Sequence, residues 1–135
     1  AVPAGGSTLP VTAENVKKQL HKVTMKGREV FKLGVRIMPE AALHTLQIAG
    51  LTVEDIDLVI PHQANLRIIE AVGERIGVPS EKLYINVDRY GNTSAATVII
   101  ALDEALRSKR VNSGDLVLLV TFGAGLTWGA SIIRM

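Results

Sequence analysis

The chain has 135 residues, of which 47% are hydrophobic and 21% are charged, and its formal net charge at pH 7 is +2. This composition suits one packed globular domain, or part of a larger one, and argues against intrinsic disorder. No apolar run approaches the roughly 20 residues that a membrane-spanning helix needs. Residues 1–10 also lack the charged and apolar regions of a secretory signal, so we expect no contact with a membrane.

The sequence contains no cysteine, which excludes disulfides, thiolate metal ligands and a thiol nucleophile. The three histidines lie at positions 21, 44 and 62, without the spacing of a zinc site, so we expect no metal. His21 and His44 have no polar residues grouped around them and are predicted to be surface residues.

Basic residues gather between positions 17 and 28. Such a cluster can be a solvated face, or it can attract an acidic protein or phosphate groups, and the composition favours neither. Aromatic residues make up 4% of the chain and do not alternate with the basic ones, which argues against nucleic-acid binding. The members of the cluster are Lys17, Lys18, Lys22, Lys26 and Arg28.

The first part of the chain predicts an irregular lead-in over residues 1–19, followed by a short strand at 20–25 and a turn at Gly27. Apolar residues then recur at helical spacing over residues 28–49. Pro39 is expected to kink or split this helix, and Gly50 is a suitable residue to end it.

The remainder alternates between strand and helix patterns. This order predicts right-handed crossovers and an α/β fold, in which helices pack on a mixed, mostly parallel sheet. The helix predicted at 64–77 would end at Gly77 and would have Ile68, Ile69, Val72 and Ile76 as its inward positions. The inward positions of the helix predicted at 93–109 would include Val98, Ile99, Leu102 and Leu106. Strands are predicted at 57–61, 83–87, 115–122 and 130–135, the last antiparallel, and helices at 64–77 and 93–109.

Three segments are each expected to follow a strand at one edge of this sheet: residues 61–63, 90–94 and 122–125. His62 and Asn92, from the first two, could aim two hydrogen-bond donors at a developing oxyanion or enolate. Backbone N–H groups of the glycine-rich turn at 123–125 could form a second anion hole. Alternatively, His62 is a satisfied turn residue and the GNTS segment a helix cap.

The motifs PHQANLRII (61–69), DRYGNTSAA (88–96) and FGAGLTWGA (122–130), with MKGREVFK (25–32) before them, occur in this order. Together they resemble the C-terminal signatures of the β-ketoacyl-acyl-carrier-protein synthase III family, the condensing enzymes that start fatty-acid synthesis. The resemblance covers residues 20–135. A histidine followed by an asparagine distinguishes this branch from relatives that use two histidines.

The resemblance implies a thiolase-like fold, of which residues 20–135 would be the C-terminal half, in a cytoplasmic, homodimeric enzyme. His62 and Asn92 would be the catalytic pair that promotes decarboxylation of a malonyl thioester, and Ala124 would supply an oxyanion N–H. The resemblance assigns docking of the acyl carrier protein to Gln63, Ala64, Asn65, Leu66 and Arg67, and coenzyme A binding to Gly27, Phe31, Asn65 and Arg67. Acyl-CoA would be a substrate, with no cofactor.

The chain departs from the family by lacking the nucleophilic cysteine, which the resemblance places in an N-terminal half. Thr93 or Ser94 could replace that nucleophile, but both fit better as helix-cap residues. We expect the chain alone to be inactive in condensation. The alternatives are a non-catalytic module that binds the carrier protein, or another condensing enzyme of the hydroxymethylglutaryl-CoA or polyketide synthase type.

Overall fold

The computed structural model describes residues 2–135, which form two compact units, one ending at Val30 and one spanning Phe31–Met135. The first unit contains the helix α1 (Ala13–Lys17), whose N-cap Thr12 accepts a hydrogen bond from the backbone N–H of Asn15. The strand predicted at 20–25 is wrong, because these residues form a turn and irregular backbone. The predicted division of the chain between residues 19 and 20 stays a prediction.

The helix α2 (Gly27–Ala49) begins at Gly27, where a turn was predicted, and Pro39 does not split it. A proline inside a helix leaves the carbonyl four residues earlier without its N–H donor. That carbonyl belongs to Val35, and it accepts a hydrogen bond from Arg75 Nη1 of a neighbouring helix at 3.3 Å. A side chain therefore replaces the missing backbone donor. As predicted, the helix stops at Gly50, which has a φ of +67°.

The sheet has three strands in the order β1 (Leu58–Pro61), β2 (Leu116–Gly123) and β3 (Thr127–Arg134). β1 and β2 are parallel, with Pro61 opposite Val120, and β2 and β3 are antiparallel, with Val120 opposite Ala130. Three residues of β1, Leu58 to Ile60, are at most 1% exposed. The predicted mixed α/β architecture is confirmed, although only one of the two strand pairings is parallel.

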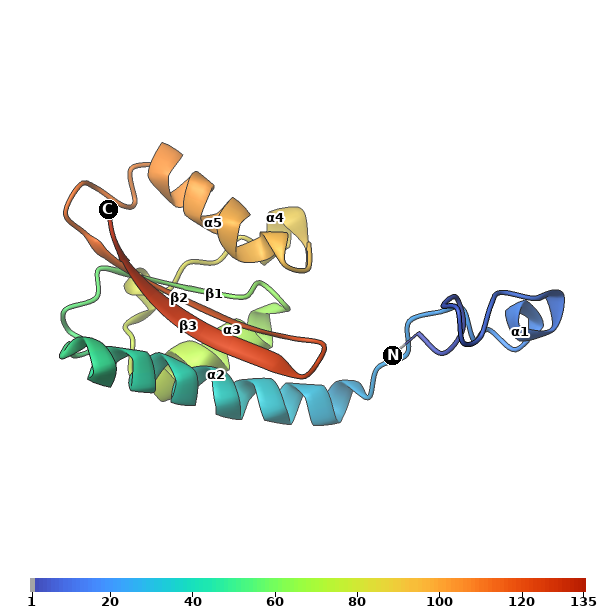
Figure 1. Ribbon diagram of the computed structural model, residues 1–135. Helices are drawn as coiled ribbons and strands as arrows, with labels where there is room; N and C mark the ends of the chain where they lie inside the picture. The colour runs from blue at the N-terminus through green and yellow to red at the C-terminus, as the bar shows by residue number, and fades with distance from the viewer. Residues whose placement is uncertain (1) are drawn as a thin grey trace. The chain divides into compact units, whose positions relative to one another are not determined.

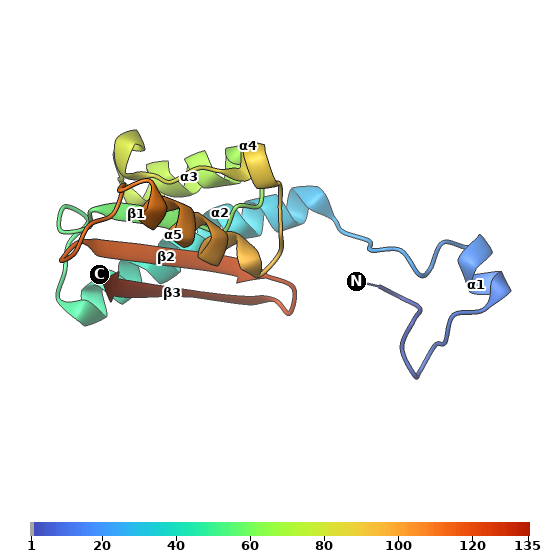
Figure 2. The same ribbon diagram turned by 90° about the horizontal axis from the view of Figure 1, so that it is seen from above.

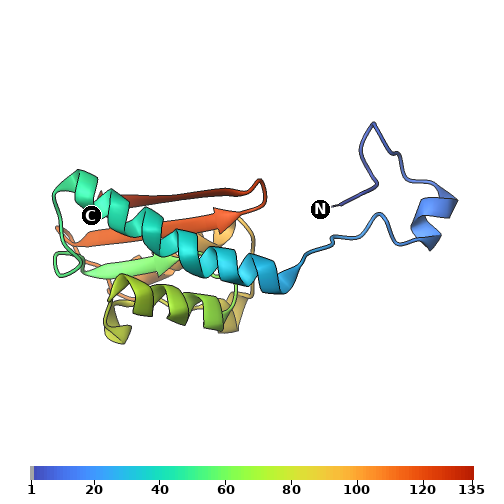
Figure 3. The ribbon, with the colours of Figure 1, turned by 90° about the horizontal axis from the view of Figure 1, so that it is seen from below.

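Helices cover both faces of this sheet, with α2 and α3 (Leu66–Ile76) on one face and α5 (Ala96–Arg107) on the other (Figures 1 and 3). The predicted inward row of α3 is buried and contains Ile68, Ile69, Val72 and Ile76. In α5 the predicted row is only partly correct, because Ile99 is 62% exposed and Leu106 is 40% exposed. The small residues Ala101 and Ala105 lie in the core instead, and their small size lets the helix pack closely against the sheet.

The segment between α3 and α5 differs most from the prediction. Leu83 makes only an isolated parallel bridge with Val59, and no strand extends over 83–87. Two short helical segments flank it, η1 (Ser80–Lys82) and α4 (Val87–Tyr90). The backbone N–H of Asn86 donates to the side chain of Gln63 at 2.9 Å, so a side-chain amide takes the place of a neighbouring strand.

Candidate active site

The candidate site lies at the edge of the sheet where β1 and β2 both end. His62 directly follows β1, and its backbone N–H donates to the carbonyl of Val120 in β2 at 2.7 Å. The turn at residues 124–126 joins β2 to β3 at the same edge. The loop between α4 and α5, which carries Asn92, lies at this end of the sheet as well (Figure 2). It follows a helix rather than the predicted strand.

His62 is 9% exposed, and its ring Nδ1 lies 2.5 Å from the hydroxyl oxygen of Thr97 in α5. Burial lowers the pKa of His62 below the ordinary value of a solvated histidine, because a charged ring would lose hydration. The imidazole is therefore neutral near pH 7. Since Nδ1 is occupied, Nε2 is the ring atom that can meet a ligand.

Asn92 is exposed, and its side-chain Oδ1 accepts a hydrogen bond from the backbone N–H of Ser94 at 2.9 Å. Because the oxygen end of the amide is used within the loop, the NH2 end can donate elsewhere. Gly91 allows the chain to enter this loop with φ +65° and ψ −165°, a conformation nearly restricted to glycine.

Gln63 is 1% exposed, and its side chain lies inside the fold rather than at a docking surface. Its Nε2 donates to the carbonyls of Pro61, at 2.8 Å, and Tyr84, at 3.2 Å. Its Oε1 accepts from the N–H of Asn86. This burial does not fit the carrier-binding role predicted for Gln63, because every polar atom of the amide already has a partner in the protein.

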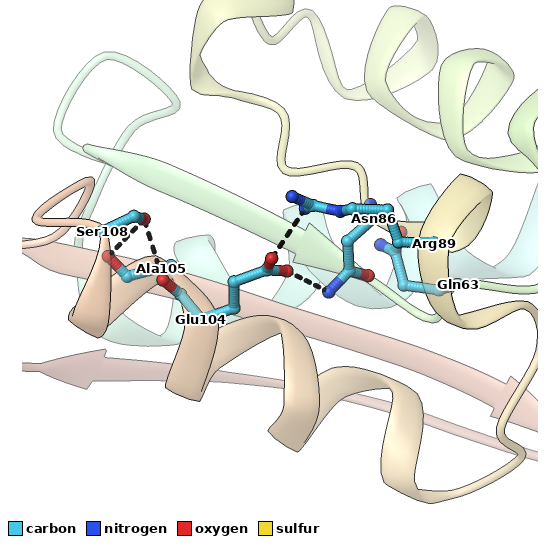
Figure 4. Close-up of polar contacts among 6 residues, drawn as sticks. All are labelled: Gln63, Asn86, Arg89, Glu104, Ala105 and Ser108. Atoms are coloured by element: carbon cyan, nitrogen blue, oxygen red, sulfur yellow. Dashed lines mark hydrogen bonds and ion pairs between the residues drawn. The ribbon is translucent and has the colours of Figure 1, made fainter.

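Figure 4 shows that this network continues from Asn86 to Glu104 in α5. The Asn86 Nδ2 donates to one carboxylate oxygen of Glu104 at 2.8 Å, and Arg89 pairs with the other at 2.9 Å. The residues immediately after β1, the short helix α4 and the helix α5 are thereby connected beside the candidate site.

A surface hollow lies beside the start of α3, lined by Phe31, Asn65, Leu66 and Arg67. Three of these four residues, Phe31, Asn65 and Arg67, were predicted to bind coenzyme A. Asn65 is also the N-cap of α3, and its side chain accepts from the N–H of Ile68 at 3.0 Å. Gly27 belongs to the other compact unit, and its role stays a prediction.

Ala64 follows Gln63 and is partly exposed, whereas Ala124 lies in the exposed turn after β2. Within residues 2–135, no three His, Asp or Glu side chains gather to hold a metal ion. In the same residues, no helix is both long and apolar enough to cross a lipid bilayer.

Sequence reasoning did not find Thr97 and Asn86, which contact His62 and Gln63, or Glu104, which contacts Asn86. Thr97 was assigned only to a helix, and Asn86 to a strand. Their contacts with His62 and Gln63 join residues 35 and 23 positions apart, so no local pattern reports them.

The fold and site define this chain as a thiolase-like α/β protein with a histidine and an asparagine at one sheet edge. Residues 46–135 match the family described as 3-oxoacyl-[acyl-carrier-protein] synthase III C terminal. The chain belongs to this family, which confirms the resemblance found in its motifs.

Two curated relatives, both called beta-ketoacyl-[acyl-carrier-protein] synthase III, come from Caldanaerobacter subterraneus and Symbiobacterium thermophilum. They are 55% and 56% identical over 98% of this chain, and the chain spans 40% of the length of each. The crystal structure of the Thermus thermophilus enzyme of the same name matches with a TM-score of 0.83 at 56% identity, over 85% of this chain and 36% of that one. The thiolase-like fold class is thereby confirmed.

Proposed function

We propose that this chain is the C-terminal catalytic part of an enzyme that condenses an acyl-CoA primer with a malonyl group on acyl carrier protein, with loss of CO2. The observation that carries the proposal is the buried, neutral His62, tethered through Nδ1 at the carboxyl end of β1. A neutral ring can donate from Nε2 without adding a buried charge. Such a donor, beside the free amide NH2 of Asn92, suits an oxygen on which negative charge develops.

In the proposed step, the bond between the malonyl α-carbon and its carboxylate breaks and CO2 leaves. The electron pair moves into the thioester, whose oxygen becomes an enolate held by His62 Nε2–H and the NH2 of Asn92. The α-carbon of the enolate then attacks the acyl thioester on a cysteine, a carbon–carbon bond forms and the cysteine thiolate leaves. Backbone donors near Ala124 would hold the oxygen of the acyl thioester.

The proposal requires a cysteine from a segment outside this chain, because these 135 residues contain none. An apolar hollow between α5, β2 and β3 supports such a partner, because Ile99 in its lining is 62% exposed. An N-terminal half of the same fold would cover this surface. The hollow is lined by Ala95, Val98, Ile99, Leu119, Val120, Thr121, Gly129, Ala130 and Ser131.

We also propose that the hollow lined by Phe31, Asn65, Leu66 and Arg67 receives coenzyme A or the phosphopantetheine of the carrier protein. Arg67 is exposed and offers a permanent positive charge to phosphate or to an acidic carrier. Ala64 and the N-terminal end of α3 complete the proposed carrier surface, while Gly27 stays a candidate for coenzyme A contact. On the basis of family membership, we propose that the complete enzyme is a cytoplasmic homodimer that needs no cofactor.

The test supplies the N-terminal half of a synthase III relative in trans and follows three reactions: acylation of its cysteine, loss of CO2 from malonyl carrier protein, and condensation. His62→Ala and Asn92→Ala should each abolish CO2 loss and spare acylation, whereas His44→Ala, on the surface, should change neither. The chain alone should not condense the two substrates. If both variants release CO2 at the rate of the chain without substitutions, the catalytic assignment of His62 and Asn92 is wrong. A non-catalytic carrier-binding module then becomes the better interpretation.

A further inference from the structure

The contact between His62 and Thr97 is a close one between two buried side chains. The hydroxyl oxygen of Thr97 lies 2.5 Å from Nδ1 of His62, and the two residues are 2% and 9% exposed. We propose that Thr97 is a positioning residue, which donates its hydroxyl proton to Nδ1 and thereby holds His62 in the tautomer protonated at Nε2.

The direction of this hydrogen bond follows from the place of Thr97 in α5. A threonine inside a helix often donates its hydroxyl to the carbonyl four residues earlier, as Thr45 does to Ala41 at 2.9 Å. Thr97 is the second residue of α5, which begins at Ala96, and the carbonyl four residues earlier, in Thr93, accepts the backbone N–H of Ala96 at 3.3 Å instead. Among residues 2–135, His62 Nδ1 is the hydrogen-bond partner recorded for this hydroxyl.

The alternative direction would leave a buried proton without an acceptor. If Nδ1 carried the ring proton and donated it to Thr97, the hydroxyl proton would need a second partner in the core. A buried donor without an acceptor costs about 1–3 kcal/mol. When Thr97 donates to Nδ1 instead, both groups are satisfied, and the ring proton is at Nε2.

The same threonine links the two donors of the candidate site. The backbone N–H of Thr97 donates to the carbonyl of Ser94 at 3.2 Å, and the N–H of Ser94 donates to Asn92 Oδ1 at 2.9 Å. Three consecutive hydrogen bonds therefore connect His62 to Asn92. Thr97 sets which ring nitrogen of His62 donates, and Ser94 sets which end of the Asn92 amide is free.

The use of these donors on an enolate rests on the proposed function, but the tautomer does not. It can be measured on the chain as it exists, without substrate, by NMR of the histidine ring nitrogens after labelling with the heavy isotope of nitrogen. The His62 signals are assigned by their loss in His62→Gln. Near neutral pH, Nδ1 should have the shift of a bare nitrogen and Nε2 that of a protonated one.

The variant Thr97→Val keeps the shape of the side chain and removes its hydroxyl. We expect the ratio of the Nε2–H to the Nδ1–H tautomer to fall by about tenfold, which corresponds to the loss of one buried hydrogen bond. Thr97→Ser retains the hydroxyl and should keep the ratio within about twofold of the original. A purely structural role of Thr97 would predict no difference between these variants in the tautomer once both are folded.

A wild-type spectrum with the proton on Nδ1 overturns the inference, as does an unchanged ratio in Thr97→Val. If Thr97→Val does not fold by circular dichroism, Thr97→Ala provides the same comparison, and the wild-type spectrum alone still tests the tautomer. If only the proposed function is wrong, the NMR spectrum still shows the Nε2–H tautomer of His62, but the assembled enzyme does not release CO2. Failure of the inference would leave decarboxylation intact with the proton on the other nitrogen.

Discussion

The side-chain amide of Asn86 donates a hydrogen bond to the carboxylate of Glu104 at 2.8 Å, across 18 positions of sequence. Asn86 is 1% exposed, whereas the side chain of Glu104 is 20% exposed. The contact connects the segment before α4 to the middle of α5, on either side of the loop that carries Asn92. Its loss would leave a polar group in the core without a partner.

Glu104→Ala should therefore lower the free energy of unfolding by about 1–3 kcal/mol, the cost of an unsatisfied buried donor. Asp103→Ala is the matched control, because Asp103 pairs with Arg107 on the same helix at the surface. An exposed pair of this kind contributes about 0.2–1 kcal/mol. Urea unfolding of both variants measures the two free energies of unfolding. Equal decreases would show that the buried contact stabilises the fold no more than the surface ion pair does.

A second prediction concerns Arg75, whose guanidinium bonds to the Val35 carbonyl left free by Pro39. Arg75→Met should cost about 1 kcal/mol of stability in the unchanged chain. In a Pro39→Ala background, the restored N–H can bond to Val35, so the same substitution should cost almost nothing. A double-mutant cycle measures this coupling, and Arg36→Met, an exposed arginine in α2, serves as the control. Equal costs in both backgrounds would contradict the compensation.

The third prediction concerns pH. Burial lowers the pKa of His62 in the folded state, so the unfolded chain binds a proton more readily than the folded one. The contribution is present above the unfolded pKa and is lost as the pH falls through the folded pKa. The free energy of unfolding should therefore decrease from about pH 7.5 to about pH 5. His62→Gln should reduce this slope and His44→Gln should keep it; identical slopes in all three proteins would refute the assignment.

The fourth prediction concerns Gly91, which precedes Asn92 with φ +65° and ψ −165°. A Cβ at this position would meet no atom within 4 Å, so the cost of Gly91→Ala would come from the backbone alone. We expect a loss of about 1–3 kcal/mol. Gly129→Ala, also without a contact for its Cβ and without a positive φ, should have a small effect in the same thermal unfolding measurement. Full stability of Gly91→Ala would mean that the loop adopts another conformation.

Much of the fold could be predicted because its signals are local. The period of α3 follows from the spacing of Ile68, Ile69, Val72 and Ile76, and its end follows from Gly77, whose φ is +84°. The apolar, β-branched composition of two runs predicted the strands β1 and β2. The glycine-rich stretch between β2 and β3 predicted the turn that makes these strands antiparallel. The order of these elements then implied that His62 and the turn at Ala124 share a sheet edge.

The errors fall where long-range contacts override local preference. Residues 83–87 have the composition of a strand, but the amide of Gln63 holds Asn86 away from that geometry. The family resemblance assigned Gln63 to a docking surface, yet the side chain is buried and bonds to Tyr84 and Asn86. In α5, the periodicity was correct, but the sheet selected the face with Ala101 and Ala105 over the face with Ile99.

The amino-acid sequence by itself determined the family, the α/β class and the two side chains, His62 and Asn92, that the proposed chemistry needs. These depend on residue identity and local spacing, which a sequence states directly. Only the tertiary structure decided which atoms of those side chains are available. The contact of His62 with Thr97 and the burial of its ring arise from packing between β1 and α5, and they select Nε2 as the donor because Nδ1 is already bonded.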